Sequence, residues 1–231
     1  AAGGFRPVVS IYSTFLQRSF DQVIHDVALQ KLPVILAIDR GGLVGEDGPT
    51  HHGSFDLSYL NLIPDLIIAS PKNGQELRNL LYTAAQQDEY PFVIRYPRDL
   101  APDSVNLDAG FEKIEIGSWD VIHVGENILI LAVGSMVQES IKTLNLLKRH
   151  KLNPTLVNCR FIKPIDESLL QDLLSRHRII FTFEENSLQG GFGQKISSFL
   201  ITGGYAKKIS LQQKGLLDKV ITHGERSVLL D

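Results

Sequence analysis

The sequence predicts an α/β protein of two domains, each a mostly parallel β-sheet flanked by helices. Short β-branched apolar runs alternate with longer segments of helical period, which is typical of βαβ units. The alternation stops once, over residues 97–124, and then starts again. No apolar run approaches the roughly 20 residues that a membrane span needs. We therefore expect two successive domains, residues 1–110 and 111–231.

In the first half, the pattern predicts strands over residues 7–11, 34–39, 66–70 and 92–96. Helices are expected over residues 14–30 and 74–87. The first of these carries one apolar face, because its apolar residues recur at spacings of three and four: Phe15, Leu16, Phe20, Val23, Ile24 and Val27. Such a face is suited to cover a sheet.

The interrupted region has several Pro and Gly turns, and we expect a hairpin around Gly117 and Ser118. Beyond it, strands are predicted over residues 128–133, 155–158, 179–183 and 208–211. The helices between them are expected over residues 137–150, 166–175 and 193–201. The second half thus repeats the strand and helix alternation of the first.

Composition excludes several classes of function. A formal net charge of -3, with basic residues scattered along 231 residues, argues against a nucleic-acid or anionic-membrane partner. The single cysteine, Cys159, excludes an internal disulfide, fits a reducing compartment and is expected in the core. The start AAGGFRPVVS lacks an initiator Met and a signal peptide, so we expect a piece of a longer protein.

Candidate site residues follow the predicted strands of the first half. Ligands of open α/β sheets bind beyond the carboxyl ends of the strands. The first strand is followed by Tyr12, Phe15 and Arg18, the second by Arg40, and the fourth delivers Arg95 and Arg98. Most have a purely structural explanation. Tyr12 and Phe15 could be core, Arg95 could simply pair with a carboxylate, and Arg98 could be a solvated turn residue or a partner of Asp99. Their convergence on one edge favours a site.

The loop DRGGLVGEDGPTHHGSFD, residues 39–56, is the strongest single signal. Its five glycines permit positive φ and close backbone approach to a ligand. It contains no lysine, which excludes a P-loop, and adjacent histidines without a third ligand argue against zinc. A pocket remains in which His51 or His52 binds or moves a proton, Asp47 biases its charge and an arginine holds an anion.

The second domain offers one weaker candidate. Glu184-Glu185-Asn186 and the glycines at 190, 191 and 193 predict a strand end followed by a helix N-terminus. This is either an anion-binding corner or, as we prefer, only the turn that starts the helix.

The first half contains the segments IYSTFLQR, DGPTHHGSFDLSYL, PDLIIASP and FVIRYPRD, and the second half contains ILILAVGSM, VNCRFIKPID, TFEENSLQGGFGQ and ITHGERSVLL. These two sets of segments resemble the pyrimidine-binding domain and the C-terminal domain, respectively, of the 1-deoxy-D-xylulose-5-phosphate synthase family of the transketolase superfamily. The resemblance implies a thiamine-diphosphate-dependent transferase that condenses pyruvate with D-glyceraldehyde 3-phosphate, releasing CO₂. It serves isoprenoid, thiamine and pyridoxal biosynthesis. It also implies Mg²⁺, a homodimer, and a location in the bacterial cytoplasm or the plastid stroma.

Carried over residue by residue, the resemblance implies that Phe15 stacks on the aminopyrimidine of the cofactor, with Tyr12 beside it and near the substrate. His51 matches the active-site histidine and Asp47 the acidic residue before it, whereas His52 is only a neighbour. The remaining matches line the substrate cavity: Arg18, Arg40 and Arg98, of which Arg40 and Arg98 are candidates for the aldehyde phosphate.

Two elements of the family pattern are not in this sequence. The glutamate that activates the cofactor belongs to an AEQH motif upstream of AAG, and the diphosphate and Mg²⁺ signature belongs to an N-terminal domain. We therefore expect this chain to need its own N-terminal thiamine-diphosphate-binding domain and to be inactive alone. The alternatives are the C-terminal subunit of a split transketolase-like enzyme and a non-catalytic α/β assembly module.

Overall fold

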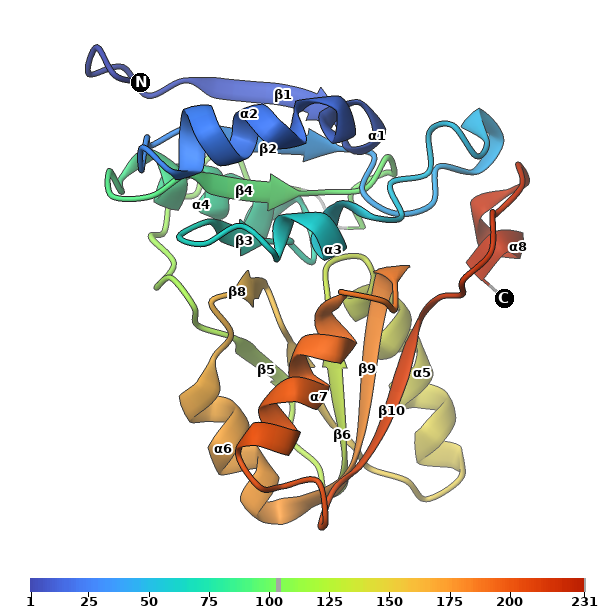
Figure 1. Cartoon of the computed structure of the whole chain (residues 1–231). Helices are drawn as coiled ribbons and strands as arrows, with labels where there is room; N and C mark the ends of the chain where they lie inside the picture. Colours follow the sequence, from blue (N-terminus) through green and yellow to red (C-terminus); the bar gives the residue numbers. More distant parts are fainter. Residues whose placement is uncertain (103–104, 231) are drawn as a thin grey trace.

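Two β-sheets, one above the other, organise the chain (Figure 1). The structure, a computed structural model, describes residues 1–102 and 105–230. Each sheet has five strands and is parallel except at one edge. The predicted architecture of two mostly parallel sheets flanked by helices is confirmed.

The first sheet brings the carboxyl ends of three strands together. Its order is β1 (Val8–Tyr12), β2 (Ile35–Asp39), β4 (Phe92–Arg95), β3 (Ile67–Ala69) and β8 (Phe161–Lys163). Tyr12 is paired with Asp39, and Ile38 with Arg95, so β1, β2 and β4 end at the same level. The fifth strand, β8, comes from the second half of the sequence and pairs antiparallel with β3.

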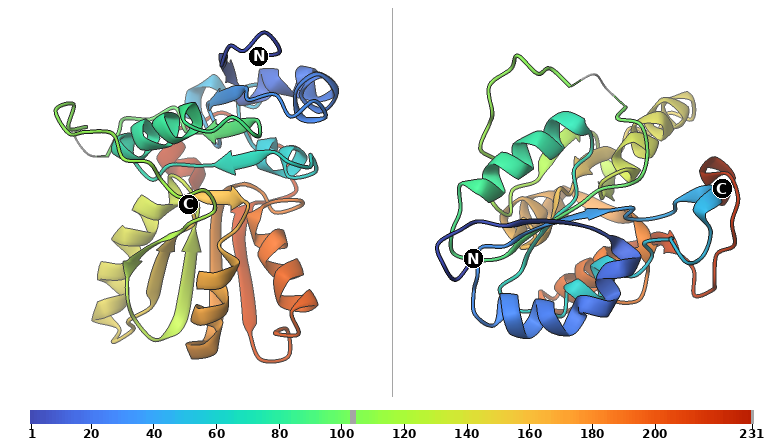
Figure 2. Two further views of the ribbon diagram at one scale, coloured as in Figure 1. Left: turned by 90° about the vertical axis from the view of Figure 1, so that its left-hand side faces the viewer. Right: turned by 90° about the horizontal axis from the view of Figure 1, so that it is seen from above.

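Helical segments lie on both faces of this sheet (Figure 2). On one face lie residues 13–28, and on the other α4 (Gly74–Ala85), whose N-terminus is capped by the Asn73 side chain. A short helix, α3 (Asp56–Leu60), follows the glycine-rich loop, which itself contains the 3₁₀ turn η3 (Gly45–Asp47).

The helix predicted over residues 14–30 is found as consecutive helical turns over residues 13–28, but it is not a regular α-helix. The segment is divided into α1 (Ser13–Leu16), the 3₁₀ turn η1 (Gln17–Ser19), α2 (Phe20–Gln22) and the π-helical turn η2 (Val23–Ala28). Ser19, with φ -107° and ψ 14°, leaves the helical region. Val23 and Ala28 are five residues apart and both buried, a spacing that a π turn, but not an α-helix, keeps on one face.

The second sheet has the order β10 (Ser210–Leu216), β9 (His177–Ser187), β6 (Asn127–Ala132), β7 (Thr155–Asn158) and β5 (Asp120–His123). Its two faces pack against different helices. Ile130 and Ala132 of β6 join α5 (Met136–Arg149) in a small cluster. Leu129 and Leu131 join the main core with α6 (Glu167–Arg176) and α7 (Phe192–Thr202). This is the alternation that a strand buried on both faces requires.

The prediction of a hairpin around Gly117 and Ser118 is wrong. Gly117, at φ +88°, lies in a turn in which Ser118 N–H donates to Glu115 O, but no strand precedes it within residues 105–116. The strand that follows, β5, pairs with β7 instead. The sequence patterns also gave no prediction for α3, η3, β5, β8 and α8 (Arg226–Leu230), all of five residues or fewer.

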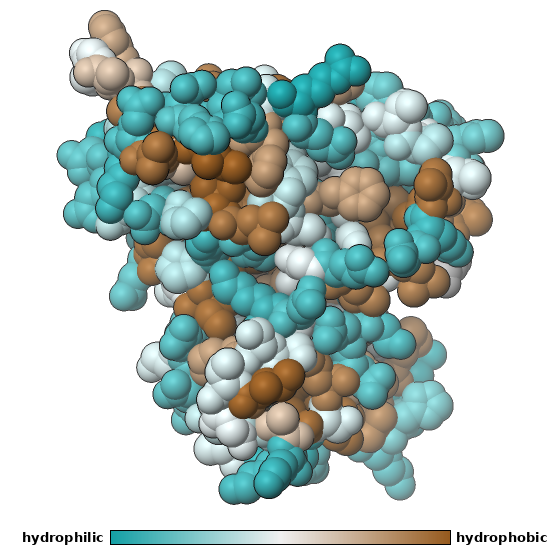
Figure 3. All heavy atoms as spheres, in the orientation of Figure 1, coloured by the Kyte–Doolittle hydropathy of each residue, from teal (hydrophilic) through white to brown (hydrophobic). Residues whose placement is uncertain are grey.

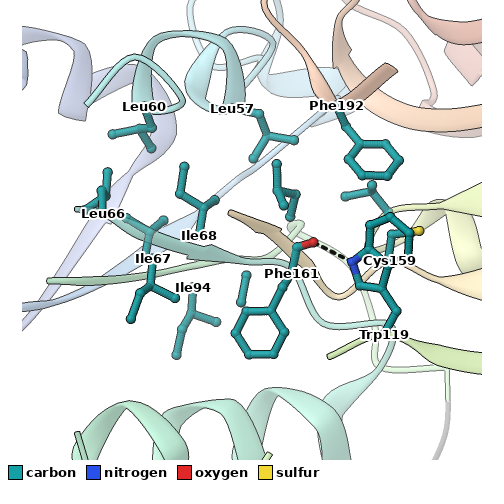
Figure 4. Packing of buried hydrophobic residues seen from close by; sticks show 14 of the residues in the cluster. Leu57, Leu60, Leu66, Ile67, Ile68, Ile94, Trp119, Cys159, Phe161 and Phe192 are labelled. Carbon is teal, nitrogen blue, oxygen red and sulfur yellow. Dashed lines mark hydrogen bonds between the residues drawn. The ribbon is translucent and has the colours of Figure 1, made fainter. Parts of the chain in front are cut away.

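A continuous apolar core joins the two sheets. Trp119, in the connection between them, donates its indole N–H to the carbonyl of Phe161 at 2.7 Å and meets the ring of Phe192 edge to face (Figure 4). Cys159 is completely buried beside them, as expected, and burial raises the pKa of its thiol well above the ordinary value. Within residues 1–102 and 105–230, no helix has the length and apolar character that a transmembrane span requires.

Candidate functional site

Aromatic and charged side chains meet beyond the ends of β1, β2 and β4. The rings of Tyr12 and Phe15 stack with centroids 5.1 Å apart. His51, from the glycine-rich loop, lies edge-on to both, at 6.4 Å from Tyr12 and 5.7 Å from Phe15. We call the following residues the site cluster: Tyr12, Phe15, Arg40, Asp47, His51 and Arg98. The strand ends bring together four of the six residues expected there, namely Tyr12, Phe15, Arg40 and Arg98, but not Arg18 and Arg95.

Arg40 contacts the ring of Tyr12. Its guanidinium carbon lies 3.7 Å from the centre of the Tyr12 ring, a cation–π contact. The same guanidinium contacts Asp39 at 2.7 Å and Asp47 at 3.4 Å, and its side chain is only 17% exposed. Arg40 also has φ +58°, an unusual backbone conformation for a non-glycine residue that concentrates at functional sites. Its charge is therefore already balanced by two carboxylates.

Asp47 is shared between two arginines. Its carboxylate contacts Arg98 at 3.0 Å as well as Arg40, and the Arg98 side chain is half exposed. Between Asp47 and His51, no hydrogen bond or ion pair exists in the described structure; the Nδ1 atom of His51 faces the hydroxyl of Thr50 at 3.0 Å. The direct contacts of Asp47 are thus with the two arginines, and the expectation that it biases the charge of His51 stays a prediction.

Arg18 lies apart from these contacts. It is exposed on η1, and within residues 1–102 and 105–230 its side chain makes no hydrogen bond or ion pair. It stays available for an anion that approaches the aromatic pair from solvent.

The two histidines have different surroundings. His52 is buried; its Nδ1 accepts the N–H of Val44 at 3.1 Å and its Nε2 lies 3.1 Å from the carbonyl of Thr222. Because Nδ1 is the acceptor, Nε2 carries the proton and donates to Thr222. His52 therefore joins the loop to the C-terminal segment, and His51 is the histidine that faces the aromatic pair.

The glycines of the loop allow close approach to other parts of the protein. A Cβ at Gly41 would lie 2.4 Å from the Arg95 side chain, and one at Gly42, where φ is +90°, 2.5 Å from Glu185. A Cβ at Gly53 would lie 2.2 Å from the carbonyl of Arg40. The expectation that these glycines make room for a ligand is corrected at these three positions: they make room for protein atoms.

Arg95 pairs with a buried carboxylate, which was the structural alternative to a role in the site. It is 2% exposed, pairs with the fully buried Asp56 at 3.2 Å, and donates to the carbonyls of Gly53 and Glu185. It links β4, α3 and β9 and does not face the site cluster's open side.

The corner between β9 and α7 is filled by the carboxylate of Glu184, a residue of β9. Glu184 accepts the N–H groups of Phe192 and Gly193, both at 2.8 Å, at the start of α7. Burial raises the pKa of Glu184 to about 7, against the opposite effect of those two donors. The helix N-terminus is therefore already occupied, which supports the simple helix-start interpretation over an anion site.

Four charged residues near the cluster were not among those predicted for this site. Asp39 pairs with Arg40, and Glu185 with Arg226 at 2.6 Å; Arg226 also contacts Asp99 at 2.9 Å. Asp39 could have been found, because it ends an apolar strand beside Arg40. Arg226 could not, because no local pattern connects it to residues more than a hundred positions earlier.

The cluster can bind a flat ring and an anion. Phe15 is 50% exposed, so part of its ring is open to solvent. Figure 3 shows that apolar residues lie uncovered at several places on the face it draws. Arg98 lines two cavities, of about 520 and 840 Å³, beside the cluster. Among the described residues, no group of three or more His, Cys, Asp or Glu side chains is arranged to hold a metal ion.

Known families match both halves of the chain. Residues 1–104 match the pyrimidine-binding domain of transketolase, and residues 117–231 the transketolase C-terminal domain. A 1-deoxy-D-xylulose-5-phosphate synthase of Aquifex aeolicus is 48% identical over 229 residues, 99% of this chain and 36% of the relative. One of Dictyoglomus thermophilum is 48% identical over 231 residues, all of this chain and 37% of the relative. The chain thus spans little more than a third of the length of these relatives.

Solved structures show the same fold. A chain described as a split gene transketolase, an inactive beta4 tetramer, superposes with a TM-score of 0.83 at 25% identity, over 94% of this chain and 69% of its own. A transketolase mutant of Pichia stipitis gives 0.72 at 19% identity, over 96% and 31%. The fold and the aromatic site at its strand ends define a transketolase-like protein. Within that class, the chain belongs to the 1-deoxy-D-xylulose-5-phosphate synthase family.

Proposed function

We propose that this chain forms the pyrimidine-binding and C-terminal parts, residues 1–110 and 111–231, of a synthase. The complete enzyme condenses pyruvate with D-glyceraldehyde 3-phosphate to 1-deoxy-D-xylulose 5-phosphate and CO₂. The observation that carries the proposal is the site cluster: His51 faces a half-exposed Phe15–Tyr12 stack, and two arginines flank one carboxylate beside it.

The cluster fits the pyrimidine half of thiamine diphosphate. The open face of Phe15 suits a flat aminopyrimidine, and Tyr12, fixed by Arg40, extends the apolar wall. When bound, this cofactor supplies a carbanion equivalent that removes CO₂ from a 2-oxo acid and joins the remaining two carbons to an aldehyde. The diphosphate and Mg²⁺ sites are assigned to a separate N-terminal domain, so this chain alone is inactive.

The chain's own residues bind and orient the substrates. Arg98 holds the phosphate of the aldehyde, because its guanidinium is half exposed and shares Asp47 with Arg40. Arg40 assists, although it stays paired with Asp39. Arg18 lies at the entrance and attracts the anionic substrates, while Tyr12 contacts the reacting end of the substrate. His51 binds or protonates the oxygen of the substrate carbonyl from the edge of the aromatic pair.

The assay is CO₂ release by the full-length enzyme, with a comparison of phosphorylated and plain D-glyceraldehyde. Arg98→Ala should raise the KM for the phosphorylated aldehyde about ten- to a hundredfold, the value of a charge-assisted hydrogen bond, and hardly change that for the plain one. Arg176→Ala, which removes an arginine from an exposed pair on α6, is the control. A full-length protein that releases no CO₂ when given both pyruvate and D-glyceraldehyde 3-phosphate would refute the proposal.

The family comparison supports this function over a subunit of a split transketolase-like enzyme. Identity to the synthases is 48%, against 25% to the split gene transketolase. The intact site cluster argues against a non-catalytic assembly module. We further propose a homodimer, in the cytoplasm of a bacterium or in the plastid stroma.

A further inference from the structure

The C-terminal segment of residues 222–226 contacts the glycine-rich loop at several points. The carbonyl of Thr222 accepts the Nε2–H of His52 at 3.1 Å, and the N–H of Gly224 donates to the carbonyl of Gly45 at 3.4 Å. In Figure 1 the segment leading to α8 lies next to the loop, although about 170 residues separate them in sequence.

Each contact adjoins a member of the site cluster. His52 directly follows His51, and Gly45 begins the turn η3 that ends at Asp47. The third contact is the ion pair between Arg226 and Asp99, at 2.9 Å, and Asp99 directly follows Arg98. The segment therefore holds the sequence neighbours of three members of the site cluster: His51, Asp47 and Arg98.

Glu185 connects the segment to the base of the loop. It accepts two contacts from Arg226, at 2.6 and 3.3 Å, and one oxygen also accepts the N–H of Leu43 at 2.6 Å. The hydroxyl of Ser135 donates to its other oxygen at 2.7 Å. The Glu185 side chain is fully buried, so without Arg226 its charge would lose its only guanidinium partner among the described residues.

The loop needs such contacts because its own structure is weak. Three of its glycines, Gly42, Gly45 and Gly48, have positive φ, and η3 is a single turn. Glycines lose more conformational freedom on ordering than other residues, so contacts from elsewhere must fix the loop.

We propose that residues 222–226 of the C-terminal domain position the site cluster, with Arg226 as the principal positioning residue. This rests on the proposed function, since the groups it positions are those assigned to catalysis. Arg226 touches no reacting atom. It orders the loop through Glu185 and orders Arg98 through Asp99.

The test combines amide hydrogen exchange with kinetics in the full-length protein. In Arg226→Ala, the amides of Leu43, Val44 and His52 should exchange about ten- to a hundredfold faster, because a charge-assisted contact is lost, while those of β2 stay unchanged. Arg226→Lys should fall between, and Arg176→Ala should match the wild type. The kcat for the condensation should fall in the same order as the loop loses protection.

Asp99→Asn provides a second variant that leaves no buried charge unpaired, in case Arg226→Ala does not fold. Asp99 connects Arg226 to Arg98 but not to the loop, which Arg226 reaches through Glu185. The Asp99→Asn variant should therefore raise the KM for the phosphorylated aldehyde and leave the loop amides protected. Three results for Arg226→Ala would each overturn the proposal. The loop amides could exchange as in the wild type, amides throughout both domains could exchange faster by the same factor, or turnover could stay full although the loop amides exchange faster. An inactive wild-type enzyme would refute the proposed function instead, and the exchange result would still decide the positioning role.

Discussion

Replacing each of the two adjacent histidines by alanine should separate catalysis from stability. The imidazole of His52 is 4% exposed, and its loss leaves the N–H of the buried Val44 without an acceptor. An unsatisfied buried donor costs about 1–3 kcal/mol. Lost packing of the ring adds about 1 kcal/mol more. The carbonyl of Thr222 can bond to water, because Thr222 is exposed. We therefore expect His52→Ala to lower the free energy of unfolding by about 2–4 kcal/mol.

His51→Ala should leave stability unchanged within about 0.5 kcal/mol, because the side chain's only hydrogen bond in the described structure is to the exposed Thr50. Its turnover in the full-length enzyme should fall by about a hundredfold or more, as expected for a positioned acid or base. His52→Ala should lose about tenfold at temperatures where it stays folded, because the loop is held less firmly.

Urea unfolding followed by circular dichroism measures the first effect, and CO₂ release measures the second. His52→Asn is the matched control, since its amide oxygen can still accept the Val44 N–H and should restore part of the stability. Equal losses of turnover in folded His51→Ala and His52→Ala would contradict the separate roles. So would a large fall in stability for His51→Ala.

Three further predictions concern other contacts. Arg95→Met should cost about 3–5 kcal/mol of unfolding free energy by leaving the buried Asp56 unpaired, and Asp56→Leu added to it should recover part of this; a fully additive double variant would argue against the pairing. Glu184 has a folded-state pKa of about 7 against an ordinary 4.5, so the folded protein binds the extra proton. Its stabilisation is full below pH 4.5 and is lost as the pH rises through 7, on the order of 3 kcal/mol in total. The urea midpoint of Glu184→Gln should therefore fall less than that of the wild type as the pH rises through 7. Plots of urea midpoint against pH that run parallel for variant and wild type would refute this. Gly53→Ala should lower the urea midpoint, because its Cβ would lie 2.2 Å from a backbone carbonyl; an unchanged midpoint would show that the loop can shift freely.

Long apolar runs made most of the fold predictable. Strands such as β2 and β6 are buried on both faces and therefore form continuous apolar sequences, which local patterns detect. The three-residue β8 and the four-residue β5 are too short for a periodic signal, and both depend on partners far along the chain. The hairpin prediction is wrong for the same reason, because β5 pairs with the distant strand β7.

The candidate site was predictable where it depends on strand ends. That rule places Tyr12, Arg40 and Arg98 together from the sequence alone. It could not show that Asp47 contacts arginines and not His51, because that choice depends on the path of a glycine-rich loop. The contacts of Arg226 with Asp99 and Glu185 join distant residues, and such tertiary pairs leave no spacing in the sequence.

The antiparallel pairing of β8 with β3 bears on how this polypeptide can be divided. Lys163 and Phe161 complete the first sheet opposite Ile68 and Ala69, so a cut near residue 110 would remove an edge strand from the N-terminal piece. That piece would expose the unpaired backbone of β3, and an exposed edge strand promotes aggregation. A recombinant pyrimidine-binding domain should accordingly carry residues up to β8 or be co-expressed with the remainder, and domain exchange between homologues should keep both halves from one parent.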